Sequence, residues 1–181
     1  MTSTIIQNHY RLRYTNFAMA IQETTRKSPR LPEELVDSTS FLLKRLGFSA
    51  KGRSIAAFEQ AGHSPYAYAV LATLDEGHRE TQAAIADALG YDRSQLVGIL
   101  DELEEQNLIE RQRDKADRRR HLVLLTPDGR KALAKLRALT TRLDDEFLAP
   151  LSDEEREDLH RLLLKLAEVH EPRCAPPLPS S

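Results

Sequence analysis

Positive charge is concentrated in one short stretch of the chain, residues 111–121. Six lysine and arginine side chains lie there against two aspartates. Cations this close together attract phosphate strongly, because only charges within about a Debye length of an anion, roughly 8–10 Å, escape screening. The stretch therefore indicates nucleic acid as a partner. The alternative is a solvated strand edge whose charge keeps it from pairing with other strands. The six cations are Arg111, Arg113, Lys115, Arg118, Arg119 and Arg120.

The rest of the chain does not share this charge. Among its 181 residues, 26 lysines and arginines face 28 acids, a net charge of −2. Residues 144–171 hold ten of the acids and three cations. The chain is thus polarised, and the local stretch rather than the sum governs its attraction for an anion.

Few side chains suit catalysis or metal binding. The single cysteine, Cys174, excludes an internal disulfide and every multi-cysteine zinc pattern. The six histidines show no ligand spacing, and there is neither a glycine-rich phosphate loop nor a GxSxG motif. We therefore expect no enzyme activity, no cofactor and no metal.

No membrane segment is expected either. The mean hydropathy is −0.50, and no run approaches 18 apolar residues. The N-terminus lacks the apolar segment and cleavage site of a secretory signal. The expected location is the cytoplasm.

Two helices joined by a tight turn should place side chains next to the basic stretch. Thr81 caps a short helix, Gly90 can adopt the left-handed conformation that ends it, and Asp92 caps a second helix that runs to about residue 106. This is the pattern of a helix-turn-helix, although an ordinary helical hairpin would give the same spacing. If Leu96 and Leu100 anchor the second helix on the core, five side chains face outward. They are Arg93, Ser94, Gln95, Val97 and Gly98.

The basic stretch itself reads as a two-stranded hairpin with strands at 108–113 and 121–125. Further helices follow, one begun by Thr126 and Pro127 and one by a capping box at Ser152. Upstream, residues 33–62 predict a helix with a kink near 47–53, because two glycines there weaken it. Ser64 and Pro65 predict the next helix start.

The stretch from 81 to 129 resembles the MarR family of winged-helix transcription regulators. The most specific matches are DRR at 117–119 and LTPDG at 125–129. The resemblance implies a mainly α (α+β) fold, a winged helix-turn-helix with a helical dimerisation region. The expected division is an N-terminal arm (1–30, with a possible extra helix), a dimerisation region (31–62 and 127–171), a DNA-binding lobe (63–126) and a disordered tail (172–181).

The resemblance also implies residue roles. The helix 92–106 would be the recognition helix, and the hairpin would be a wing that enters the minor groove. Asp117 would orient Arg119 for insertion there. Arg111 resembles the arginine that closes the first wing strand, and Thr81 and Gln82 resemble phosphate contacts.

Some positions depart from the family pattern. Val97 stands where the family often has a hydroxyl, and Gly98 where a polar side chain is common. Base reading is therefore expected to concentrate at Arg93, Ser94 and Gln95. Gln95 either pairs with adenine or only completes a capping box with Asp92.

The expected function is sequence-specific DNA binding by a homodimer that regulates transcription, as a repressor, from a near-palindromic operator on double-stranded DNA. The family often responds to small aromatic or phenolic effectors. One alternative is a winged helix that binds protein instead of DNA. Another is a small helical enzyme, but no group of residues in the sequence forms a recognisable catalytic site. Four residues lie on elements that would line an effector pocket: Arg45, Phe58, His63 and Tyr66. The alternative is that they belong to the hydrophobic core.

Overall fold

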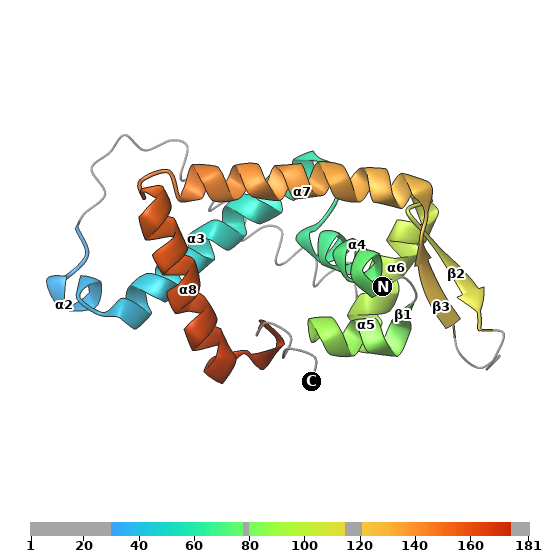
Figure 1. Ribbon diagram of the computed structural model, residues 1–181, viewed down its shortest axis with the longest axis horizontal. Helices are drawn as coiled ribbons and strands as arrows, with labels where there is room; N and C mark the ends of the chain where they lie inside the picture. The colour runs from blue at the N-terminus through green and yellow to red at the C-terminus, as the bar shows by residue number, and fades with distance from the viewer. Residues whose placement is uncertain (1–29, 78–79, 115–120, 175–181) are drawn as a thin grey trace. The chain divides into compact units, whose positions relative to one another are not determined.

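The computed structural model describes residues 30–77, 80–114 and 121–174 (Figure 1). The N-terminal arm, the tip of the predicted wing and the last seven residues lie outside these ranges. The chain divides into two compact units, one ending at Gly62 and one beginning at His63.

The first unit contains α2 (Glu33–Val36) and α3 (Thr39–Gln60). The predicted kink near 47–53 is wrong, since α3 runs unbroken through Gly47 and Gly52. The break falls earlier, where the Ser38 side chain accepts a hydrogen bond from the backbone N–H of Phe41 at 3.4 Å and starts a new helix. Each glycine weakens a helix by about 1 kcal/mol, which a 22-residue helix tolerates.

The second unit carries the remaining elements, and their order matches the winged-helix prediction (Figure 1). The predicted caps are present at Ser64, Thr81, Asp92, Thr126 and Ser152. The elements are α4 (Pro65–Gly77), β1 (Glu80–Thr81), α5 (Gln82–Leu89), α6 (Arg93–Glu105), β2 (Ile109–Arg113), β3 (His121–Leu125), α7 (Pro127–Phe147), α8 (Asp153–His170) and the 3₁₀ turn η1 (Pro172–Cys174).

One hydrophobic core holds the helices of this unit against its sheet. Apolar residues of α4, α5, α6, β3 and α7 are almost completely buried there. The predicted anchors of α6, Leu96 and Leu100, are 1% and 0% exposed. The other residues of this core include Val70, Leu71, Leu74, Ile85, Leu103, Val123, Leu133 and Leu136.

The sheet has three antiparallel strands in the order β1-β3-β2. The two-residue strand β1 was not predicted, because a segment this short has no periodicity to read. Strands β2 and β3 pair from Ile109↔Leu125 to Arg113↔His121, so they form the predicted hairpin up to its tip.

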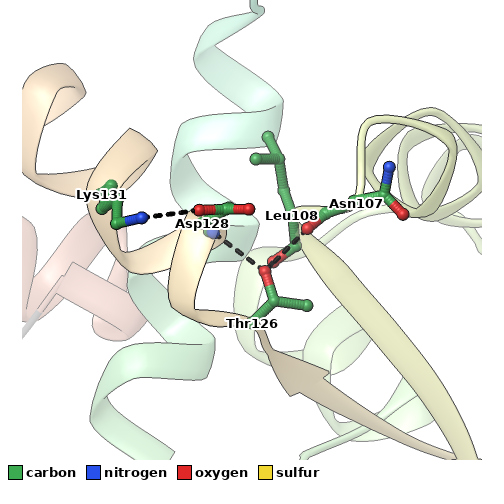
Figure 2. A network of polar contacts seen from close by, with 6 residues as sticks. Asn107, Leu108, Thr126, Asp128 and Lys131 are labelled. Carbon is green, nitrogen blue, oxygen red and sulfur yellow. Dashed lines mark hydrogen bonds and ion pairs between the residues drawn. The ribbon is translucent and has the colours of Figure 1, made fainter.

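A polar network joins the base of this hairpin to α7 (Figure 2). Asn107 has a left-handed φ of 58°, a conformation that asparagine tolerates better than most other residues with a side chain. The Thr126 hydroxyl donates to the carbonyls of Asn107 (2.7 Å) and Leu108 (3.0 Å), and its oxygen accepts from the N–H of Gly129 (2.9 Å). One threonine thus caps α7 and fixes where the hairpin starts.

The C-terminal part departs from the prediction of a disordered 172–181. Residues 172–174 form η1, while 175–181 lie outside the described ranges. No helix within the described ranges is both long and apolar enough to cross a membrane.

Candidate nucleic-acid interface

The turn between α5 and α6 is built on Gly90. Its φ of 66° is left-handed, and the N–H of Tyr91 donates back to the carbonyl of Ala86 at 3.0 Å. A Cβ at Gly90 would also overlap the guanidinium of Arg173 in η1. The turn therefore favours glycine for its left-handed backbone conformation, whereas the exposed Arg173 side chain could move aside for a Cβ.

Asp92 fixes the first turn of α6. Its carboxylate accepts hydrogen bonds from the Ser94 hydroxyl (2.5 Å) and from the backbone N–H of Gln95 (2.8 Å). These two bonds hold the pKa of Asp92 below its usual range. Within the described residues, the Gln95 side chain makes no reciprocal bond to the Asp92 backbone, whereas the capping box at Ser152 is complete. That geometry leaves the Gln95 amide available to another partner.

The five residues predicted to face outward from α6 are all exposed. Leu96, Leu100 and Leu103 occupy the opposite face and are buried. A Cβ at Gly98 would meet nothing within 4 Å, so the backbone there is open to close approach. The exposed face of α6 thus carries the polar residues Arg93, Ser94 and Gln95 in its first turn.

Thr81 and Gln82 lie together where α5 begins. The Thr81 oxygen accepts from the N–H of Ala84 at 3.2 Å, and both residues are half-buried. The first N–H groups of a helix and its dipole favour an anion, which suits the predicted phosphate contact.

Arg111 is engaged by α6. Its guanidinium donates to Asp101 at 2.5 Å and lies 3.6 Å from Glu104, which also accepts the backbone N–H of Arg111 at 3.1 Å. The Arg111 side chain is 20% exposed. This ion pair of Arg111 with Asp101 and Glu104 was not predicted from the sequence. The signal was the strand alternation, which puts Arg111 on the same side of β2 as the buried Ile109.

The other wing residues divide between two regions. Arg113 is exposed at the end of β2, opposite His121. The remaining predicted wing residues, Lys115, Asp117, Arg118, Arg119 and Arg120, lie outside the described residues.

The predicted effector residues fall on both units. Arg45 is exposed and Phe58 buried on α3. In the second unit, His63 has a buried Nδ1 without a hydrogen-bond partner among the described residues. Tyr66 makes an edge-to-face contact with Tyr91, their ring centroids 5.7 Å apart. Burial, and secondarily the nearby Tyr66, raises the pKa of Tyr91.

Comparisons with known proteins point the same way. A family model for the MarR family matches residues 62–120. A Thauera aromatica protein named as a candidate transcriptional regulator of the hcr operon is 38% identical over 129 residues, 67% of this chain and 78% of that protein. The transcriptional regulator HosA of Escherichia coli is 34% identical over 99 residues, 55% of this chain and 73% of HosA.

Solved structures share the fold. A transcriptional repressor, CouR, bound to a 23-mer DNA duplex has a TM-score of 0.69 and 31% identity, over 77% of this chain and 99% of that one. A MarR-family regulator from Rhodococcus sp. RHA1 has a TM-score of 0.65 and 29% identity, over 75% of this chain and 96% of that one.

Proposed function

The chain belongs to the MarR family of transcriptional regulators, and on this premise we propose that it binds a near-palindromic operator as a homodimer and represses transcription. The observation that carries the proposal is the exposed face of α6, polar at its N-terminus and flanked by strand β2, which carries the exposed Arg113. A recognition helix needs this arrangement, because its N-terminal side chains reach base edges in the major groove. The DNA-bound CouR, 31% identical, supports the same use of the fold.

Each part of the interface has a distinct task. Arg93, Ser94 and Gln95 would contact bases, and Gln95 could pair with adenine through two hydrogen bonds. Thr81 and Gln82 would contact the DNA backbone, which positions the protein without reading sequence. In the wing, Asp117 would orient Arg119 toward a narrow minor groove.

A second copy of the chain would cover apolar surface that the protomer leaves exposed. Leu162, Leu163 and Leu166 form a stripe on α8, and each is at least 39% exposed. The first unit has a comparable group that includes Leu42, Leu43 and Leu46. Twofold pairing would set two recognition helices about one DNA turn apart, roughly 34–36 Å, which is the reason to expect a near-palindromic site. Such a regulator would act in the cytoplasm.

The test of DNA binding starts from selection of bound duplexes from a random pool. Arg119→Ala should weaken binding to the selected duplex by about fivefold or more, since a good arginine contact to DNA contributes about 1–3 kcal/mol. Arg142→Ala, which alters an exposed arginine of α7, is the control and should bind normally. Equal affinity of the Arg119 variant and the parent would refute wing insertion. Failure to enrich any duplex would favour the protein-binding alternative.

We infer that Arg111 positions the wing and does not bind phosphate, because its guanidinium is hydrogen-bonded to Asp101 and lies 3.6 Å from the carboxylate of Glu104. Arg111→Ala should weaken DNA binding by about three- to tenfold, the worth of about 1 kcal/mol, as the wing loses its tie to α6. The salt dependence of binding should stay the same. Arg113→Ala is the matched variant, and it should lower the salt slope by about one for each phosphate that the variant no longer neutralises. A lower slope for Arg111→Ala would mean that it contacts DNA directly.

We also infer that a small aromatic or phenolic compound releases the operator. Support comes from a structure of CouR bound to p-coumaroyl-CoA. That protein is 28% identical to this chain and covers 75% of it. His63, whose Nδ1 has no hydrogen-bond partner among the described residues, and the exposed ring of Tyr66 both belong to the second unit and could contact such a ligand. An effector releases DNA only if it binds the DNA-free conformation more tightly. Isothermal titration against phenolic acids, paired with a DNA-release assay, should find a compound that does both; a panel that binds without releasing DNA would contradict this.

A further inference from the structure

Val97 is an apolar side chain on the polar outer face of α6. Among the described residues of the lobe 63–126, Tyr66 and Val97 are the two most exposed large apolar side chains, at 37% and 42%. Tyr66 has an aromatic partner in Tyr91. The isopropyl group of Val97 is therefore not packed in the core of the lobe.

The helix periodicity places Val97 beside the predicted base-reading residues. It follows Arg93 by four positions and Ser94 by three, so the three side chains are neighbours on one face. Leu96 and Leu100 point the other way, into the core. Gly98 adds no side chain and has nothing within 4 Å, so the helix can approach a surface closely at this point.

The floor of the major groove offers one kind of apolar group to such a side chain. Thymine presents its C5 methyl, whereas cytosine, guanine and adenine present amino groups or acceptor atoms. A valine pressed against those polar edges would remove their water without replacing the hydrogen bonds that the water made. Against a thymine methyl, the same contact buries apolar surface on both sides.

From this placement we propose that Val97 is a specificity-determining residue that selects a thymine in each half-site by contact with its C5 methyl group. The inference rests on the proposed DNA binding through α6 and deepens it. It assigns a base preference to a position whose side chain has no hydrogen-bonding atom. It also extends base reading one turn beyond Arg93 and Ser94.

The experiment uses the full chain and the duplex selected from a random pool. Each thymine of the half-sites is replaced in turn by deoxyuridine, which removes the methyl and keeps the pairing edge. At one thymine per half-site, we expect the parent to lose about three- to fivefold in affinity for each methyl removed, the worth of one buried methyl group. In Val97→Ala the same replacement should cost less than about 1.5-fold, because the contact is already absent.

Two controls separate this contact from other effects. Glu105→Ala alters an exposed residue at the C-terminal end of α6, outside the base-reading turn, and should show the same deoxyuridine penalty as the parent. Thermal melting of each variant tests that it is folded. The inference is overturned if no deoxyuridine affects the parent, if the penalty persists in Val97→Ala, or if selection shows no thymine preference. In each of these cases the parent still binds its selected duplex, whereas a parent that binds no duplex would overturn the proposed function as well.

Discussion

Replacing Gly129 by alanine should lower the melting temperature by roughly 4–12 °C. Gly129 is buried in the first turn of α7, and a Cβ there would overlap the backbone carbonyl of Leu108 and come within 2.8 Å of Leu125. Overpacking of this kind costs about 1–3 kcal/mol, toward the upper end here because a backbone carbonyl cannot rotate away. Each 1 kcal/mol lowers the melting temperature of a chain this size by about 2–4 °C.

The Leu108 carbonyl also accepts from the N–H of Thr126 at 3.1 Å and from its hydroxyl at 3.0 Å (Figure 2). Displacing it would therefore loosen the base of the hairpin as well as the start of α7. Gly98→Ala is the matched control, since Gly98 also lies in a helix of the second unit but has open space around it. Its stability should be unchanged or higher by up to about 1 kcal/mol. Melting curves at equal protein concentration compare the two, and equal melting temperatures would show that α7 can move away from Leu108 without cost.

Features that depend on neighbouring residues in the chain were predictable from sequence. The caps at Ser64, Thr81 and Asp92 follow from short polar side chains before a helical pattern. The left-handed residues Gly90 and Asn107 follow from the conformations that these residue types tolerate. Local chemistry decides these positions, so the order of elements could be read from the sequence.

Features that depend on contacts between distant segments could not be read in this way. The ion pair of Arg111 with Asp101 joins β2 to α6, ten residues apart, and requires the register of both elements. From sequence alone, Gly129 is only a residue that weakens a helix. The structure shows that the Leu108 carbonyl leaves no room for a Cβ at this position. The break between α2 and α3 came at Ser38 instead of the glycines, because a good cap started a helix that the glycines only weakened. Tertiary position decides the cases of Arg111 and Gly129, whereas the break at Ser38 is set by a local cap that was not identified from the sequence.

Salt should control DNA binding more strongly than most single substitutions do. If the dimer neutralises about 6–10 phosphates, raising salt from 50 to 200 mM should weaken binding about 10³–10⁵-fold, because each contact releases a condensed counterion. The net charge of −2 does not oppose this, since ten acids of the chain lie in 144–171, outside the lobe. Fluorescence anisotropy with the selected duplex at several salt concentrations measures the slope.

Charge location rather than total charge should set that slope. Glu154→Gln makes the whole chain less negative by one charge, yet Glu154 lies at the start of α8, outside the basic stretch. Its slope should equal that of the parent, because a charge that contacts no phosphate displaces no counterion from DNA. Arg113→Ala changes the net charge by one in the opposite sense, but Arg113 lies on β2. The salt slope of this variant should fall by about two for a symmetric dimer. Similar changes of slope for the two variants would mean that net charge governs binding, and a parent slope near zero would exclude phosphate contacts by the wing.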